Sequence, residues 1–510
     1  MTAFNLAGTL AHHADRFPER PCLVWGDETV TYRELDRRAA ETATGLSRLG
    51  VGRGDVVAVV LYNCPEFLEL MFAVARLGAI FMPVNWRLAG EEVTYIAGHA
   101  GASLVVSEPE LAPLAEAARK NLAGARVVGV GGAAPGWTAF EALRRKDAAP
   151  ALVNVAADDV HRLMYTSGTT ARPKGVMITY ANLYWKNAAH VVEFGVTGAD
   201  RGLACGPLYH VGALDLTTTT VLYAGGTVEI HRKFEADRAL DAFERRGVSC
   251  VWLAPAMVNQ ILAHPSLERR NLSGVRFIID GGEKMPLPLI ERLVRAFPGA
   301  WFADAYGLTE TVSGDTFLDK RATMDRLGSV GKPCLHLELA IWDEHDRPVG
   351  AGTLGEIVLR GPKVFTGYWK DAEATATAFR GGWFHTGDIG YLDPEGYLYV
   401  VDRKKDMIIS GGENIASPEV ERVLYEHPAV LEAAIVGRAD PRWGEVPVAF
   451  VVCRPGAAAT EAELREFCLA RLARFKVPRA VLFVEALPRN QSGKVLKRVL
   501  REQAAAPART

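Results

Sequence analysis

A short segment rich in hydroxyl, glycine and lysine side chains could bind an anion. It follows the strand-like residues 163–165, precedes a second strand-like run, and reads Thr166-Ser167-Gly168-Thr169-Thr170-Ala171-Arg172-Pro173-Lys174-Gly175. Hydroxyl groups and glycine amides can donate hydrogen bonds to polyphosphate oxygens, and Lys174 adds a compact positive charge. The spacing differs from that of a Walker A loop. Taken alone, the segment is as consistent with a polar surface turn as with a phosphate-binding loop.

Four further motifs follow in order along the chain. They are Tyr306-Gly307-Leu308-Thr309-Glu310, Thr386-Gly387-Asp388, Asp402-Arg403-Lys404-Lys405-Asp406 and Pro488-Arg489-Asn490-Gln491-Ser492-Gly493-Lys494. Each has an ordinary alternative, since Asp388 could cap a turn, Glu310 could favour a helix N-terminus, and Lys494 could be a solvated charge. With the first loop, the motifs resemble in type and order those of the adenylate-forming superfamily of acyl-CoA synthetases, luciferases and peptide-synthetase adenylation domains. The shared order favours the resemblance over five separate coincidences.

The resemblance implies that the protein uses ATP and Mg²⁺ to activate a carboxylic acid. The carboxylate would attack the α-phosphate of ATP and expel pyrophosphate, so positioning and cations must supply the catalysis. By the resemblance, Glu310 holds Mg²⁺, Thr309 binds the α-phosphate, and Lys494 bridges the substrate carboxylate and ribose oxygens. Lys174, Thr309, Glu310 and Lys494 are therefore the expected catalytic residues.

The resemblance also implies a nucleotide site. Tyr306 would lie against adenine, Asp388 would accept both ribose hydroxyls, and Arg403 would contact the ribose or its phosphate. The other residues expected to bind ATP or AMP are Thr166, Ser167, Gly168, Thr169, Thr170, Lys174, Gly281, Gly282, Glu283, Asp304, Ala305, Gly307, Thr309, Val400 and Lys494. The glycine pair follows a strand-like run, where an α/β sheet usually binds ligands. Ala171 departs from the family pattern, which usually has glycine there, and we expect a stiffer loop that keeps its activity.

The acid pocket is expected from segments that resemble those lining the acyl group in the family. The expected pocket residues are His210, Gly212, Gly282, Gly307 and Leu308, with residues 184–190, 210–216, 281–283 and 308–314 around them. Small side chains at Gly212 and Ala213 would leave room for the acid. Asp215 would lie about 140° from His210 on a helix at ~100° per residue. We therefore expect Asp215 to make a structural hydrogen bond rather than to recognise the substrate.

A second set of motifs implies coenzyme A as the acceptor of the acyl group. Ser410, Gly411, Gly412 and Glu413 resemble the loop that lines the pantetheine tunnel in acyl-CoA synthetases. Trp443, Lys476 and Arg479 resemble residues that hold the nucleotide end of coenzyme A. Asp402 would be the hinge about which the last part of the chain rotates after adenylation. The open alternatives are a carrier protein or an amine as acceptor, or a nucleotide-binding protein without turnover.

Composition limits the other possible functions. The 510-residue chain exceeds the ~250–300 residues of one hydrophobic core, so several domains are expected. A formal net charge of -2 offers no broad attraction for nucleic acid or anionic lipid.

The seven cysteines are widely spaced, without zinc-ligand spacing, and are interpreted as buried thiols. No signal peptide or membrane-spanning run is found near the N-terminus. We expect a cytoplasmic protein without membrane insertion, with a homodimer as the candidate assembly.

The order of predicted elements indicates an α/β fold. Strands predicted at residues 56–62, 104–107, 249–253 and 276–279 alternate with helical patterns, including a Thr31/Glu34 capping box and helices beginning at Pro255 and Pro286. Residues 337–401 read as an antiparallel β section. After Asp402 an α+β pattern predicts helices at residues 418–427 and 461–474 and strands at residues 433–436 and 448–452. The prediction is a large N-terminal domain of helix-covered sheets, residues 1–401, and a small mobile domain, residues 402–510.

Overall fold

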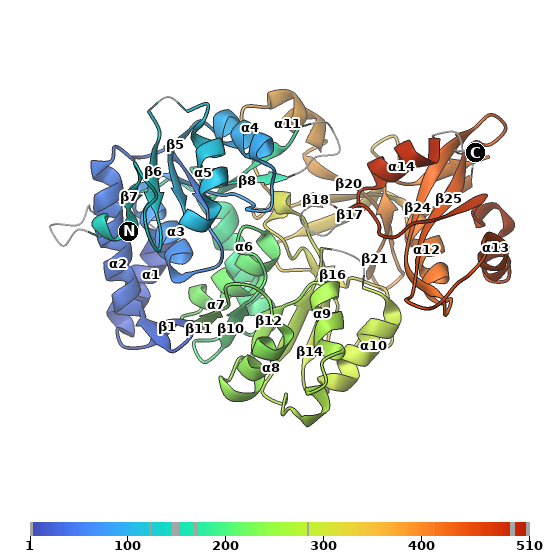
Figure 1. Cartoon of the computed structure of the whole chain (residues 1–510), viewed down its shortest axis with the longest axis horizontal. Coiled ribbons are helices and arrows are strands. Elements are labelled where there is room, and N and C mark those ends of the chain that lie inside the picture. Colours follow the sequence, from blue (N-terminus) through green and yellow to red (C-terminus); the bar gives the residue numbers. More distant parts are fainter. Residues whose placement is uncertain are drawn as a thin grey trace. The chain divides into compact units, whose positions relative to one another are not determined.

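The chain folds into two compact units (Figure 1). The structure is a computed structural model that describes residues 4–122, 124–144, 152–166, 172–282, 285–411, 413–489 and 495–505. The first unit comprises Met1–Leu339 and Leu359–Phe384, and the second comprises Ala340–Val358 and His385–Thr510. Asp402, the predicted hinge, lies within the second unit, and the boundary predicted there stays a prediction.

The first unit contains a sheet in which seven strands can be described. Its order is β7 (Thr138–Ala139), β6 (Arg126–Gly129), β5 (Ala102–Ser107), β3 (Val56–Val60), β4 (Ile80–Pro83), β8 (Val160–Thr166) and β9 (Lys174–Thr179). Neighbouring strands are parallel except β8 and β9, which form an antiparallel pair. Helices α4 (Gly90–Ala100) and α5 (Ala112–Arg119) lie beside this sheet in Figure 1. Their residues Ile96 and Ala115 belong to the same hydrophobic core as the strands.

A second sheet of the same unit has nine strands among the described residues. Its order is β16 (Lys332–Pro333), β15 (Thr316–Phe317), β14 (Trp301–Tyr306), β13 (Phe277–Asp280), β12 (Cys250–Trp252), β10 (Arg201–Ala204), β11 (Thr227–Ile230), β1 (Pro21–Trp25) and β2 (Glu28–Thr31). The strands from β14 to β1 run parallel. Helices α8 (Ala236–Arg245), α9 (Pro255–Leu262) and α10 (Leu287–Ala296) share its hydrophobic core.

The remaining helices of the first unit complete the α/β pattern. They are α1 (Leu6–Arg16), α2 (Tyr32–Arg48), α3 (Pro65–Leu77), α6 (Tyr180–Phe194), α7 (Thr220–Tyr223), α11 (Ala372–Ala378), the 3₁₀ turns η1 (Pro109–Leu111), η2 (Phe140–Ala142), η4 (Leu267–Arg269) and η5 (Thr309–Thr311), and the π-helix η3 (Gly212–Thr219). Thr31 caps α2, because its hydroxyl accepts from the amide of Glu34, but the predicted capping box is incomplete because Glu34 does not accept from the Thr31 amide. The Glu34 carboxylate accepts from Arg37 and Arg38. The helices predicted at Pro255 and Pro286 are confirmed.

The predicted antiparallel section is confirmed as a third sheet. It joins β17 (Glu338–Trp342), β18 (Gly355–Arg360), β20 (Trp383–Leu392) and β19 (Phe379–Arg380), with β21 (Leu398–Arg403) paired to β20. Both β19 and β21 run antiparallel to β20.

The C-terminal part of the second unit has the predicted α+β character. A fourth sheet has the order β23 (Glu413–Ile415), β22 (Ile408–Ser410), β25 (Gly444–Cys453) and β24 (Val430–Asp440), with β26 (Ala480–Phe483) parallel to β25. Helices α12 (Ser417–Tyr425) and α14 (Lys497–Ala505) lie beside β24 in Figure 1. Helix α13 (Glu461–Leu469) ends five residues earlier than predicted and is followed by the 3₁₀ turn η6 (Arg474–Lys476). Strands β24 and β25 are longer than predicted because they pair along a two-stranded ladder.

The burial of the cysteines agrees with the sequence analysis. All seven cysteine thiols are free, and each is buried except that of Cys453, which is half-buried. Among the described residues, no helix combines the length and the hydropathy needed to cross a bilayer.

Candidate active site

The predicted phosphate loop connects the two strands of a β-hairpin. Thr166 at the end of β8 pairs with Lys174 at the start of β9, and Tyr165 pairs with Gly175. A side chain at Gly175 would push on the Tyr165 ring, because a Cβ atom there would lie 3.0 Å from it. The Tyr165 hydroxyl is 2.7 Å from His99 Nδ1 on α4. The hairpin therefore fixes both ends of the loop, whereas Ser167, Gly168, Thr169, Thr170 and Ala171 lie outside the described residues.

Thr309 and Glu310 lie on a strained loop that follows β14. Residues Val312, Ser313 and Gly314 all have left-handed backbone angles, with φ of 56°, 63° and 62°. That conformation is costly for a β-branched valine. The Ser313 amide donates to the Leu308 carbonyl at 2.8 Å, and Gly307 is required because a Cβ atom there would lie 2.4 Å from the amide nitrogen of Gly314. Both Thr309 and Glu310 remain partly exposed.

A buried lysine braces this loop. Lys363 Nζ donates to the carbonyls of Ser313 and Gly314 at 2.8 and 2.7 Å and to Asp315 Oδ1 at 2.7 Å. His190 Nε2 lies 3.0 Å from the Gly314 carbonyl. Burial lowers the pKa of His190 well below its usual value, and the Lys186 and Lys363 ammonium groups lower it further, so the imidazole is neutral and donates to the carbonyl. The strained backbone is held by contacts made on its buried side.

A third segment joins the hairpin to the Glu310 loop. Residues 365–369, called the strap here, follow Lys363 in the sequence. The Phe365 amide donates to the Glu310 carbonyl at 2.7 Å, and the Trp369 amide donates to the Gly175 carbonyl at 2.8 Å. The Tyr368 hydroxyl donates to Glu310 Oε1 at 3.0 Å, and Lys174 Nζ lies 4.9 Å from the centre of the Tyr368 ring. The strap thus brings one phenol into contact with both Lys174 and Glu310.

The sequence analysis missed the strap and the Lys363 brace. The available signal was the run Phe365-Thr366-Gly367-Tyr368-Trp369, whose dense aromatic residues follow a lysine in an otherwise apolar stretch. Periodicity could not identify it, since the segment is neither helix nor strand and acts through single backbone hydrogen bonds.

Glu310 suits the predicted role of a magnesium ligand. Magnesium in nucleotide enzymes is usually held by one or two carboxylates, with substrate phosphates and water completing the octahedron. Within the described ranges no group of three or more His, Cys, Asp or Glu side chains could hold a metal by itself. One partly exposed carboxylate beside the phosphate hairpin therefore fits a metal that arrives with the nucleotide.

The residues predicted for adenine lie at the carboxyl ends of two adjacent parallel strands. Asp280 of β13 pairs with Asp304 of β14, and Ala305 and Tyr306 complete β14. A Cβ atom at Gly281 would lie 2.9 Å from the Ala305 carbonyl oxygen, and Gly282 has φ of 98°. This edge of a parallel sheet is where α/β proteins bind ligands. Glu283 lies outside the described residues.

His210 lies beside an aromatic wall that the sequence analysis did not predict. Its imidazole stacks with the Trp252 ring at 6.0 Å between centroids. Cβ atoms at Gly206 and Gly212 would each lie 2.7 Å from the same ring. The small size of Gly212 therefore accommodates the Trp252 ring, and the expectation that it leaves room for the acid stays a prediction. Gly212 begins the π-helix η3 rather than an α-helix.

Asp215 is structural, as expected. Its carboxylate forms a two-pronged ion pair with Arg162 at 2.7 and 3.2 Å, and both side chains have no exposed surface. Lys186 of α6 donates to the Asp215 carbonyl and to the hydroxyls of Thr219 and Thr220. Burial lowers the pKa of Lys186 to about 7, although the Asp215 carboxylate opposes this change.

The predicted ribose and hinge residues belong to the second unit. Asp388 and Arg403 face each other across β20 and β21, with Arg403 Nε 2.6 Å from Asp388 Oδ1. Asp402 Oδ2 accepts from the amide and hydroxyl of Ser417 at 2.8 and 2.7 Å, so the hinge residue caps α12. Val400 lies on β21. Lys494 lies outside the described residues.

The structure brings together part of the predicted coenzyme A set. The Gly411 amide donates to the Trp443 carbonyl at 2.7 Å, and a Cβ atom at Gly411 would lie 2.8 Å from the Trp443 ring. Ser410 pairs with Glu413 across the β22–β23 turn, while Gly412 lies outside the described residues. Lys476 is elsewhere on the unit, bound by both oxygens of Glu419 at 2.7 Å. Arg479 is exposed.

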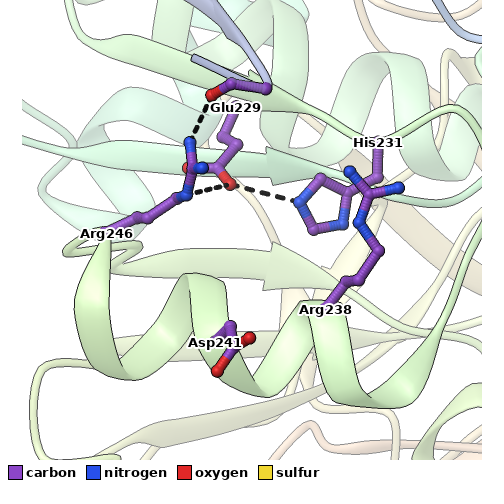
Figure 2. A pocket seen from close by; sticks show the side chains of 6 residues that line it. Glu229, His231, Arg238, Asp241 and Arg246 are labelled. Carbon is purple, nitrogen blue, oxygen red and sulfur yellow. Dashed lines mark hydrogen bonds and ion pairs between the residues drawn. The ribbon is translucent and has the colours of Figure 1, made fainter.

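A separate cavity of about 100 Å³ lies between β11 and α8 (Figure 2). Its floor is the buried pair Glu229 and His231, whose Oε1 and Nε2 atoms are 3.1 Å apart, and Arg246 lies 3.6 Å from Glu229. Arg238 and Asp241 also line it, so its two carboxylates and two guanidinium groups balance. No residue predicted for substrate or nucleotide lines this cavity.

Comparison with known proteins gives consistent similarities over the whole chain. Residues 10–369 match the family described as AMP-binding enzyme, and residues 419–494 match the AMP-binding enzyme C-terminal domain. The chain is 40% identical to a feruloyl-CoA synthase from an Amycolatopsis species, covering 95% of this chain and 96% of that protein. It is 38% identical to an indoleacetate–CoA ligase from Aromatoleum aromaticum, covering 98% of each. It resembles the solved o-succinylbenzoate coenzyme A synthetase of Bacillus subtilis in complex with ATP and magnesium ion, with a TM-score of 0.85, 32% identity, and coverage of 97% and 98%.

Proposed function

The chain belongs to the AMP-binding enzyme family and is an AMP-forming acid–CoA ligase that uses ATP and Mg²⁺, and we propose that its acid substrate carries an aromatic ring. The observation that carries this proposal is the Trp252 ring, which lies against Gly206 and Gly212 and stacks on His210. An aromatic side chain that contacts the predicted pocket residues His210 and Gly212 favours an aromatic acid, because offset or edge-on ring pairs add to the free energy of area burial. The names of the relatives, feruloyl-CoA synthase and indoleacetate–CoA ligase, support the same substrate class.

We assign the first half-reaction to the charged and hydroxyl side chains of the predicted adenylation motifs. Lys174 and the loop beginning at Thr166 would bind the departing pyrophosphate, and Thr309 would hold the α-phosphate. Glu310 would bind Mg²⁺, which supplies positive charge to the phosphoryl oxygens. Lys494 would bind the acid carboxylate and orient it for attack. Each of these groups stabilises negative charge that is concentrated in the transition state.

The nucleoside would be held by two groups of residues that lie on or directly after paired neighbouring strands. Asp388 would accept the ribose hydroxyls, and Arg403 would turn from its ion pair with Asp388 toward the ribose or its phosphate. Gly281 and Gly282 would let adenine approach the edge of β13 and β14, where Tyr306 lies. The strand geometry of these pairs supports the assignment, since it provides rigid positions for each group.

We assign the second half-reaction to the Gly411 loop. Coenzyme A thiol would attack the acyl carbonyl carbon, and AMP would leave with the oxygen that joined it to the acid. Gly411 packs tightly against Trp443, and its lack of a side chain would let the thin pantetheine chain pass. Because Lys494 and Gly411 serve different steps, the part of the chain after Asp402 would rotate between them.

The aromatic substrate is tested by comparing acids under identical conditions. Initial rates of acyl-CoA formation are measured with hydroxycinnamic, arylacetic and acylbenzoic acids and with linear fatty acids of similar volume. We expect kcat/KM for the best aromatic acid to exceed that for the best fatty acid at least tenfold. Equal or better turnover of fatty acids would contradict the proposal while leaving the acid–CoA ligase activity intact.

A further inference from the structure

We propose that Tyr368 is a positioning residue that keeps the Glu310 carboxylate and the Lys174 ammonium apart, so that magnesium and ATP meet two prepared charges. Its hydroxyl donates to Glu310 Oε1 at 3.0 Å, and its ring lies 4.9 Å from Lys174 Nζ. One side chain therefore contacts both charged groups predicted to act on the phosphates.

The strap fixes the position of this phenol. The Phe365 amide donates to the Glu310 carbonyl, and the Trp369 amide donates to the Gly175 carbonyl. The Met177 amide donates to the Gly367 carbonyl at 3.1 Å, so the strap is bonded to β9 on both sides of Tyr368. The Phe365 ring packs against the Tyr368 ring at 4.9 Å. The backbone is thus held on both sides of Tyr368, and the Phe365 ring packs against the phenol.

The need for a spacer follows from simple electrostatics. A carboxylate and an ammonium group that can reach each other at a half-buried site form an ion pair, which both must break before binding metal and phosphate. The phenol gives the carboxylate a hydrogen bond and the ammonium an aromatic face, and neither contact neutralises the charge.

Tyr368 would orient Glu310 and Lys174, and this role would matter for adenylation only. Thioester formation from a finished acyl-adenylate involves neither pyrophosphate nor its metal. Loss of Tyr368 should therefore impair the first half-reaction and spare the second, whereas a general structural defect would impair both. The inference rests on the ATP chemistry of the proposed function but not on the identity of the acid.

The test uses Tyr368→Phe and Tyr368→Leu in the full chain, with Tyr32→Phe as a matched control. Tyr32 is a buried phenol of the same unit that donates to the Gly226 carbonyl at 2.7 Å, away from the phosphate hairpin. Three quantities are measured for each variant: affinity for a non-hydrolysable ATP analogue with Mg²⁺ by calorimetry, KM and kcat for acid-dependent pyrophosphate release, and the rate of thioester formation from synthetic acyl-adenylate and coenzyme A.

We expect Tyr368→Phe to weaken the affinity for the ATP analogue with Mg²⁺ about tenfold, as for a hydrogen bond to a charged group. Tyr368→Leu should weaken it severalfold more, because it also removes the aromatic face. Thioester formation should stay within twofold of wild type in both, and Tyr32→Phe should change none of the three quantities beyond twofold. Unchanged ATP affinity in Tyr368→Phe, or an equal fall of both half-reactions, would overturn the inference. If the leucine variant does not fold, the phenylalanine variant decides. Absence of activity in the wild type with every acid would instead contradict the proposed function.

Discussion

Lys363 Nζ lies 2.7 Å from Asp315 Oδ1, and the two side chains are 1% and 0% exposed. The same ammonium group holds the carbonyls of Ser313 and Gly314. A charge pair deep in the first unit therefore supports the strained turn that carries Thr309 and Glu310. The ion pair therefore stabilises the shape of the loop that carries two predicted catalytic residues.

Replacing Lys363 by methionine should destabilise the protein by about 3–5 kcal/mol, because it leaves Asp315 as a buried charge without its cation. Chemical denaturation of the full chain measures this change. The control is Arg119→Met, which removes an exposed ion pair with Glu116 and should cost about 0–1 kcal/mol. The double variant Lys363→Met/Asp315→Asn should regain part of the loss. A Lys363→Met effect no larger than that of the control would contradict the brace.

A methyl group at residue 212 should damage the acid site selectively. In Gly212→Ala the new Cβ would lie 2.7 Å from the Trp252 ring, so the ring must shift away from its stack with His210. Overpacking of this kind costs about 1–3 kcal/mol, and we expect kcat/KM for the aromatic acid to fall about tenfold or more. The KM for ATP should remain within twofold. Gly350→Ala, whose Cβ would have no atom within 4 Å, serves as the control. A parallel loss of ATP binding would show that Trp252 is not an acid-side wall.

Lys186 should make stability depend on pH in a defined window. Its folded pKa is lowered to about 7 by burial, whereas an unfolded lysine has a pKa of about 10.4. Between these values the unfolded state binds the extra proton, so the contribution of Lys186 makes the free energy of unfolding rise with pH. The difference between wild type and Lys186→Met, measured by urea unfolding at pH 7, 8 and 9, should increase by up to about 1.4 kcal/mol per pH unit. The groups acting on this lysine are Asp215, Arg162 and Lys363. Parallel pH profiles for the two proteins would contradict the burial of its charge.

Two variants of the second unit should separate the half-reactions. Lys494→Ala should reduce acid-dependent pyrophosphate release at least a hundredfold, in line with loss of a charged group that orients the carboxylate, and leave thioester formation from synthetic acyl-adenylate nearly unchanged. Gly411→Ala should have the opposite pattern, because its Cβ would lie 2.8 Å from the Trp443 ring at a left-handed backbone angle. Equal loss of both steps in either variant would contradict the assignment of separate residues to the two half-reactions.

The sequence predicted the fold well where hydrophobic runs and turn residues coincide. The strands near Val56, Ala102 and Cys250 and the helices at Pro255 and Ser417 lie close to their predicted positions, because burial of β-branched runs and proline at a helix start are local signals. Strand lengths and the end of α13 were less accurate, since they depend on pairing with residues distant in sequence.

The motifs of the candidate site could be predicted from the sequence, but the residues that hold those motifs in place could not. Glu310, Asp388 and Gly411 occur in recognisable runs, whereas Lys363, Tyr368 and Trp252 act through contacts across 40 to more than 190 residues. A charge pair such as Lys363 with Asp315, or a ring filling the space beside Gly212, has no periodicity to detect. Only the folded structure shows whether a glycine makes room for a ligand or for a neighbouring side chain.

The central claim is that the acid is activated as an acyl-adenylate, and transfer of labelled oxygen tests it most directly. The enzyme is incubated with an aromatic acid carrying ¹⁸O in both carboxylate positions, with ATP, Mg²⁺ and coenzyme A, and the products are analysed by mass spectrometry. One carboxylate oxygen forms the bond to the α-phosphate, and the acyl carbon–oxygen bond breaks when the thiol attacks. We expect one ¹⁸O in AMP, one in the acyl-CoA and none in pyrophosphate. Label in inorganic phosphate with ADP as the nucleotide product, or unlabelled AMP, would contradict the account.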